Sequence, residues 1–159
     1  MPERSADDDL PLYFRLFNEI GIIEQLSRAL LEAQLPDGML VSHFSVLNHL
    51  IRVKDGRTPL ELARAFQVPK TTMTHTLAGL HKRALVETRP NPEDKRSKCI
   101  WITDAGRGFR EDAIAAMAPD MGALAQHMDR ETAQDLVAKL ADLRIYLDES
   151  RLAKTRLRD

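Results

Sequence analysis

Residues 58–107, which decide the fold, read TPLELARAFQVPKTTMTHTLAGLHKRALVETRPNPEDKRSKCIWITDAGR. The stretch opens with three helix-start signals. Thr58 can cap a helix, Pro59 suits the first helical position, and Glu61 can close a capping box. The segment TPLELARAF therefore predicts one short helix, and the breaker sequence QVP at 67–69 predicts where it ends and the next begins.

A second helix is predicted from near Pro69 to about Ala84. Met73, Leu77 and Leu80 follow the i, i+4, i+7 spacing of one helix face, so we expect these three side chains to be buried. Two short helices joined by a tight turn of about three or four residues are typical of a helix-turn-helix.

The pattern then changes to two short segments, 85–90 and 99–103, which are rich in β-branched or aromatic residues. The polar, proline-containing loop NPEDKRSK (91–98) separates them, so we expect a β-hairpin. A hairpin directly behind a helix-turn-helix is the arrangement of a winged helix, with residues 91–98 at the tip of the wing.

The flanking sequence predicts further helices. Residues 1–10 are acidic and without periodicity, which favours a disordered arm. One amphipathic helix is expected over 12–33, and the breakers of LPDG at 35–38 end it. Another is expected over 39–53. The expected apolar stripes are Phe14, Phe17, Ile20, Ile23 or Leu26, and Leu30 on the first helix, and Leu40, Phe44, Leu47 and Ile51 on the second.

After the hairpin, Thr103 and Asp104 restart helix, and residues 105–128 are predicted helical with a kink or break at Pro119. Asp129 is a plausible N-cap of a last helix that runs to about Ala153. This helix carries a regular leucine stripe at 136, 140, 143 and 147, and a stripe of this kind needs a partner surface.

Composition describes an ordinary globular chain of 159 residues, 43% hydrophobic and 30% charged. It has no apolar stretch of membrane-spanning length and no apolar signal region, and its single cysteine fits a reducing cytoplasm. Net charge is −1, but residues 58–98 carry +4 and residues 1–34 carry −4. Because a phosphate backbone responds to local charge, the basic middle favours nucleic acid.

On the helix expected at 70–84, polar side chains lie off the buried face, where they could contact DNA bases or phosphates. On the wing, Arg96 suits a narrow minor groove, and Lys95 and Lys98 suit phosphates. Asp94 would order the wing by a charge-assisted hydrogen bond to Arg96 or to Arg89 across the hairpin. The alternatives are a solvated helix face and a solvated charge run with about 0–1 kcal/mol in its ion pairs. The candidate DNA-binding residues are Thr58, Lys70, Thr71, Thr72, Thr74, His75, Lys82, Arg89, Lys95, Arg96 and Lys98.

Residues 58–107 resemble the MarR family of winged-helix transcriptional regulators. The shared pattern has a leucine-alanine pair in the first short helix, a leucine near the end of the recognition helix, an arginine closing the first strand, an Asp-x-Arg in the wing, and a threonine-then-glycine segment. The matching residues are Leu62, Ala63, Leu80, Arg89, Asp94, Arg96, Thr103 and Gly106. Ala84 departs from the pattern, since the family often has glycine there, and His75 stands where many relatives have arginine.

The resemblance implies a mainly α (α+β) fold: a winged helix-turn-helix with a two-stranded wing, plus long N- and C-terminal helices that form a homodimer. The expected division is a disordered arm over 1–10, a helical dimerisation region over 11–38 and 105–159, and a DNA-binding winged helix over 39–104. Two recognition helices one DNA turn apart would then read a pseudo-palindromic operator.

The resemblance also implies a small aromatic or lipophilic effector between the dimer helices and the winged helix. Candidate pocket residues are Phe14, Phe17, Met39, His43 and Phe44, although apolar helix stripes are more often ordinary core. Cys99 could sense oxidants as cysteines of some relatives do, but a structural or semi-exposed thiol is the commoner case. We assign no metal, no cofactor and no catalytic residues, because no ligand cluster, phosphate loop or nucleophile–base pair is evident.

The function that these patterns favour is a cytoplasmic, dimeric, sequence-specific double-stranded DNA-binding transcriptional regulator, not an enzyme. Such regulators are usually repressors that a small molecule releases. The alternative is a winged-helix protein-interaction module that does not bind DNA, which the negative net charge favours.

Overall fold

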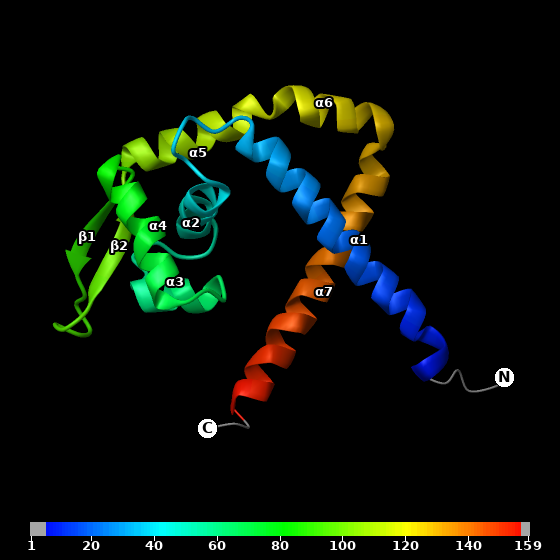
Figure 1. Ribbon diagram of the computed structural model, residues 1–159, viewed down its shortest axis with the longest axis horizontal. Helices are drawn as coiled ribbons and strands as arrows, with labels where there is room; N and C mark the ends of the chain where they lie inside the picture. The colour runs from blue at the N-terminus through cyan, green and yellow to red at the C-terminus, as the bar shows by residue number, and fades with distance from the viewer. Residues whose placement is uncertain (1–5, 157–159) are drawn as a thin grey trace. The chain divides into compact units, whose positions relative to one another are not determined.

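A computed structural model of the chain describes residues 6–156 as seven helices and a two-stranded antiparallel sheet (Figure 1). This is the mainly α, winged helix-turn-helix class that the sequence predicts. The elements in chain order are α1 (Ala6–Glu32), α2 (Val41–Arg52), α3 (Pro59–Ala65), α4 (Lys70–Lys82), β1 (Val86–Pro90), β2 (Lys98–Ile102), α5 (Asp104–Ala116), α6 (Ala118–His127) and α7 (Arg130–Arg156).

The chain divides into two compact units, one up to Met117 and one from Ala118 onward. The first unit holds α1, the winged helix and α5, and the second holds α6 and α7. No helix in the described part of the chain is both long enough and apolar enough to span a bilayer.

The core of the first unit joins the helix-turn-helix to the hairpin. Leu47 of α2, Leu62 of α3 and Leu80 of α4 are fully buried at its centre, and Ile100 and Ile102 cover it from β2. The predicted buried face of the recognition helix is confirmed, since Met73, Leu77 and Leu80 are all at most 4% exposed.

The predicted apolar stripe of α2 is partly wrong. Leu47 is buried, but Leu40 is 53% exposed, and the buried face instead includes Val46 and Leu50. Leu40 is the N-cap residue, so its backbone is extended and its side chain leaves the helical face. The buried face of α2 is therefore rotated about the helix axis relative to the predicted face, which was counted from Leu40.

The N-terminal boundary of α1 also differs from the prediction. Residues 6–10 are helical, whereas a disordered arm was expected over 1–10; residues 1–5 lie outside the described part of the chain. Acidic residues are favoured at a helix N-terminus because its free N–H groups carry partial positive charge, so an acidic run there is compatible with helix. Pro11 lies inside α1.

Both helices of the helix-turn-helix have well-defined ends. The predicted capping box of α3 is confirmed: Thr58 Oγ1 accepts the Glu61 N–H at 3.2 Å, and Glu61 Oε2 accepts the Thr58 N–H at 2.8 Å. The latter bond is the main reason that the pKa of Glu61 is lowered. These reciprocal bonds satisfy two N–H groups that the first turn would otherwise leave free.

The C-terminus of α4 forms a Schellman motif. The Leu85 N–H bonds the Leu80 carbonyl at 3.0 Å, and the Ala84 N–H bonds the His81 carbonyl at 2.9 Å. This geometry requires Ala84 to adopt a left-handed conformation, with φ 56°. The requirement explains why a glycine is suited to position 84, where this chain departs from the resemblance described above.

We expect Ala84→Gly to stabilise the protein by about 0.5–1 kcal/mol. The substitution removes the strain of a Cβ at positive φ, and this gain exceeds the stability lost because glycine increases the conformational entropy of the unfolded chain. Urea denaturation followed by circular dichroism measures the change. Ala78→Gly, at an exposed site inside α4, is the matched control and should destabilise by about 1 kcal/mol. A loss of stability in Ala84→Gly would contradict this account.

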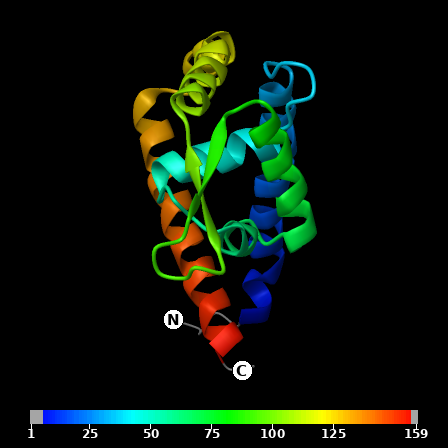
Figure 2. The same ribbon diagram turned by 90° about the vertical axis from the view of Figure 1, so that its left-hand side faces the viewer.

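The wing is a hairpin in which Val86 pairs with Ile102 and Pro90 with Lys98; it faces the viewer in Figure 2. Its base is joined to the loop before α3, since the Ile100 N–H bonds the Arg57 carbonyl at 2.8 Å. Thr103, which follows β2, caps α5 by accepting the Gly106 N–H at 3.0 Å and donates its own hydroxyl to the Ala84 carbonyl at 2.7 Å. These bonds connect the hairpin to the loop before α3 and to the turn after α4.

In the second unit, the predicted break near Pro119 is confirmed by the start of α6 at Ala118. Asp129 precedes α7 as predicted, and its carboxylate accepts the Thr132 N–H at 2.8 Å. That bond is the main reason that the pKa of Asp129 is lowered. No residue of α6, and none of α7 among those whose side chains are described, is fully buried.

Candidate nucleic-acid interface

The outer face of α4 is polar and exposed. Lys70, Thr71, Thr72, Thr74, His75 and Lys82 are all exposed, as the sequence predicts for a recognition helix. Thr76, in contrast, is buried and donates its hydroxyl to the Thr72 carbonyl at 3.2 Å. The threonines of this helix thus divide into one core residue and an outward-facing set.

The N-terminus of α4 has no side-chain cap. Its N-cap residue is Pro69, which makes no capping hydrogen bond, so the first N–H groups of the helix have no side-chain acceptor. Free N–H groups and the helix dipole together favour an anion at this end. The exposed Lys70 adds a positive charge at the same place.

Two of the candidate hydroxyl groups are already engaged. Thr58 both accepts the Glu61 N–H and donates to the Glu61 carboxylate at 3.0 Å, so its hydroxyl serves the capping box. Thr74 donates to the Lys70 carbonyl at 2.9 Å, which leaves its oxygen lone pairs and its methyl group for an outside contact.

The tip of the wing is ordered by short-range hydrogen bonds. Asp94 Oδ1 accepts the backbone N–H of Arg96 at 2.9 Å, and the Asp94 carbonyl accepts the Ser97 N–H at 3.0 Å. Asn91 donates to the Ser97 hydroxyl at 2.7 Å across the loop. Asp94 therefore bonds the backbone of Arg96, whereas the sequence suggested a bond to an arginine side chain.

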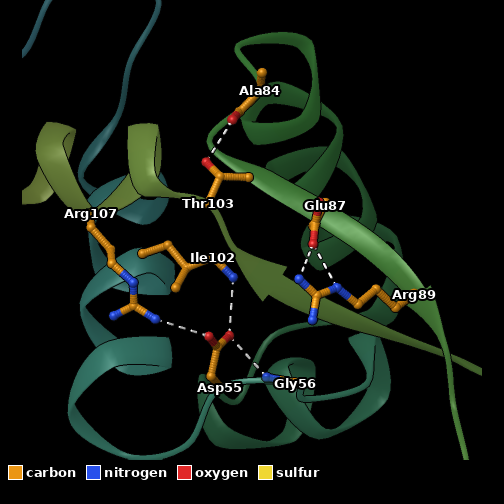
Figure 3. A network of polar contacts seen from close by, with 8 residues as sticks. All are labelled: Asp55, Gly56, Ala84, Glu87, Arg89, Ile102, Thr103 and Arg107. Carbon is orange, nitrogen blue, oxygen red and sulfur yellow. Dashed lines mark hydrogen bonds and ion pairs between the residues drawn. The ribbon is translucent and has the colours of Figure 1, made fainter.

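This use of the backbone leaves the cations of the tip available. Lys95, Arg96 and Lys98 are exposed, and within residues 9–154 none of their side chains has a hydrogen-bond or ion-pair partner. Arg89 differs, because its guanidinium pairs with Glu87 (Figure 3). The same guanidinium lies over the ring of Trp101. The wing thus has three cations without a partner among the described residues and one, Arg89, that is held on the strand.

The base of the wing is fixed by Asp55, which the sequence analysis did not single out. Its Oδ1 accepts the N–H groups of Gly56 at 2.9 Å and Ile102 at 3.0 Å, and its Oδ2 pairs with Arg107 at 3.2 Å (Figure 3). The only sequence signal was an Asp-Gly pair, which predicts a turn but none of these three contacts. Two of the contacts join Asp55 to residues about fifty positions away.

Comparison with known proteins identifies the family. A model described as "MarR family" matches residues 37–97. The multiple antibiotic resistance protein MarR of Escherichia coli is 31% identical over 133 residues, which cover 79% of this chain and 90% of that protein. The chain belongs to the MarR family. The transcriptional repressor YetL of Bacillus subtilis is 32% identical over 107 residues, which cover 67% of this chain and 64% of YetL, slightly less than two thirds.

Solved structures agree with this membership. Apo MarR from E. coli superposes with a TM-score of 0.68 at 25% identity, covering 80% of this chain and 96% of that one. A mutant E. coli MarR complexed with operator DNA has the same fold, with a TM-score of 0.65 at 24% identity, covering 88% of this chain and 99% of that one. This MarR-family chain is therefore a transcription regulator and not an enzyme.

The candidate effector residues of this MarR-family chain fall into two groups. Phe14 and Phe17 on α1 are 70% and 50% exposed, whereas Met39 belongs to the core and Phe44 is half-buried. His43 is 6% exposed, and its Nδ1 accepts the Leu40 N–H at 2.9 Å at the start of α2. Burial, assisted by the charges of Arg83 and His75, lowers the pKa of His43, so the ring is neutral at pH 7.

In this MarR-family chain, Cys99 and His49 are both at least partly shielded from solvent within the winged helix. Cys99 is buried in β2, with 5% of its surface exposed. His49 packs against Phe66 with ring centroids 5.3 Å apart, and burial is the main reason that its pKa is lowered. Among the described residues no three side chains of the metal-ligating types gather into a group.

Proposed function

We propose that this protein is a cytoplasmic, dimeric, sequence-specific double-stranded DNA-binding repressor that a small-molecule effector releases from its operator. The observation that carries the proposal is the exposed, polar face of α4 together with the basic wing in a MarR-family chain. The E. coli relative solved with operator DNA supports the same use of this fold.

The roles of the side chains follow from their positions. At the start of α4, Lys70 and the uncapped N–H groups suit a phosphate. Thr71, Thr72, Thr74 and His75 would contact base edges in the major groove, and Lys82 the backbone. On the wing, Arg96 would enter the minor groove, and Lys95 and Lys98 would contact phosphates.

The dimer is proposed from apolar side chains that are exposed on α1 and on α7 in the described part of the chain. On α1, Phe14 and Leu26 are 70% and 62% exposed; on α7, Val137 and Leu140 are 67% and 45% exposed. Apolar surface on this scale marks an association site. We assign residues 11–38 and 105–159 to dimerisation and 39–104 to DNA binding, and propose a second copy of this chain as the partner.

Two measurements test this proposal. Analytical ultracentrifugation should give twice the chain mass. Genomic fragments captured by the protein should share an inverted repeat and bind with an affinity that falls steeply with salt, with a log–log slope of about −0.9 for each neutralised phosphate. A monomer that binds no duplex at low salt would exclude the proposed DNA-binding function. It would favour the alternative function of a protein-interaction module, which the net charge of −1 supports.

Release by an effector is proposed to change the separation of the two recognition helices. A molecule bound near Phe14, Phe17, Met39, His43 and Phe44 would alter that separation, so that only one helix fits its half-site. Structures with and without effector should differ in the distance between the recognition helices, and an identical distance would exclude this mechanism.

Replacing Arg96 by alanine is expected to weaken operator binding by about 1–3 kcal/mol, because one unpaired arginine at the wing tip makes one good DNA contact. Fluorescence anisotropy with the captured operator measures the effect. Arg130→Ala, an exposed arginine in the second unit, is the control and should bind as the wild type does. Equal affinity of the Arg96 variant and the wild type would remove the wing from the interface.

A further inference from the structure

Arg89 is the one cation of the described wing that is already paired. Its Nε donates to Glu87 Oε1 at 2.6 Å, and a second guanidinium nitrogen contacts the same oxygen (Figure 3). The two residues stand two apart on β1, so they point to the same face of the hairpin. A carboxylate thus neutralises this guanidinium on the exposed face of the wing.

The ring of Trp101 holds Arg89 from the neighbouring strand. The guanidinium carbon lies 4.9 Å from the ring centroid, within cation–π range. Trp101 pairs directly with Glu87 in the hairpin, so Arg89 meets it diagonally. The ring in turn lies on Gly56, where a Cβ would come within 2.4 Å of it and φ is +70°. Only glycine therefore allows the ring to occupy this position.

A DNA phosphate and the Glu87 carboxylate would compete for the same donors. Both anions accept paired hydrogen bonds from a guanidinium. The side chains of Arg89 and Glu87 are 57% and 47% exposed, so water screens the pair and the exchange requires no opening of the core. In the unbound protein, however, the pair presents no net charge to an approaching duplex.

We propose that Glu87 is a positioning residue that limits DNA affinity by competing with the phosphate backbone for Arg89, while Trp101 keeps the guanidinium on the wing face. This inference rests on the proposed DNA-binding function and adds a regulatory residue to the same site. Removing the carboxylate frees one cation, so the protein should bind duplexes of any sequence more tightly.

Trp101 reports on the ion pair without DNA, because it is the only tryptophan of the chain. Glu87→Gln is expected to change the intrinsic fluorescence of the free protein, since the guanidinium that lies over the ring loses its carboxylate partner. Glu93→Gln removes the same charge from an exposed position in the wing loop, and should leave the emission unchanged. Identical emission of the wild type and Glu87→Gln would overturn the proposed restraint.

Binding to sheared genomic duplex of mixed sequence tests the competition itself. At low salt we expect Glu87→Gln to bind about twofold to fivefold more tightly than the wild type, the range that an exposed ion pair allows. Its log–log salt slope should steepen by about 0.9, as for one additional phosphate contact. Glu93→Gln should leave the slope unchanged, which separates competition for Arg89 from a general change in charge.

An Arg89→Gln background completes the test. If Glu87 acts through Arg89, then in the Arg89→Gln protein the added Glu87→Gln substitution should increase DNA affinity no more than the added Glu93→Gln substitution does. An equal gain with and without Arg89 would overturn the inference while leaving DNA binding intact. Failure of the wild type to bind any duplex would overturn the proposed function instead, and the competition with it.

Discussion

A Gly106→Ala variant should lose about 3 kcal/mol of folding free energy, the largest effect that we expect from adding one methyl group to this protein. A Cβ at position 106 would lie 2.1 Å from the Leu85 carbonyl oxygen and 2.8 Å from a side-chain carbon of Ile102. The carbonyl belongs to the backbone and also accepts the Thr103 N–H at 3.1 Å, so it cannot move without breaking that bond. The hairpin and α5 would have to separate.

Gly108→Ala provides the control on the same helix. A Cβ there has no neighbour within 4 Å, and the residue is exposed. We expect this variant to gain about 0.5–1 kcal/mol, because alanine is the better helix former. Denaturant titrations give the free energy of unfolding of both variants. A Gly106→Ala protein within about 1 kcal/mol of the wild type would contradict this account, because it would show that the clash between the new Cβ and the Leu85 carbonyl oxygen is easily relieved.

Asp55→Ala is expected to destabilise the protein by about 2–3 kcal/mol and to loosen the base of the wing. The change removes the acceptor of the Ile102 N–H, which belongs to a residue that is only 7% exposed, and of the Gly56 N–H. Leaving a buried N–H without an acceptor costs more than the average hydrogen bond contributes. Amide exchange at Ile102 should become faster along with the loss of stability.

Asp55→Asn separates the hydrogen bonds from the charge. An asparagine oxygen can still accept both N–H groups, whereas the ion pair with Arg107, which is half-exposed, is lost. We expect a loss of about 0–1 kcal/mol. If alanine and asparagine destabilise equally, the ion pair rather than the two backbone bonds would be what holds the wing base.

The parts of this fold that the sequence predicts well have local causes. The capping box at Thr58, the N-cap at Asp129 and the break at Pro119 each depend on residues within a few positions of one another. The spacing of Met73, Leu77 and Leu80 likewise reports one helix face. The outward-facing candidates on α4 follow from that face, since what is not buried on a short helix is exposed.

The parts that the sequence did not predict depend on distant residues or on small rotations. Asp55 reaches Ile102 across 47 positions, which no local pattern indicates. The buried face of α2 depends on where the helix starts, and Leu40 lies just outside it. Glu87 and Arg89 could have been noticed from their i, i+2 spacing on a strand, but the expected partner of Arg89 was Asp94.

Among the residues whose side chains are described, α6 and α7 contain no buried residue, and this gives the proposed dimer a consequence for the lifetime of the protein in a cell. Helices that bury their apolar faces only on association are stabilised by mass action, so their melting temperature should rise with protein concentration. Newly made chains at low copy number would then be the ones that proteases degrade fastest. The amount of regulator present would set its own half-life, and synthesis below a threshold would leave the target genes without control.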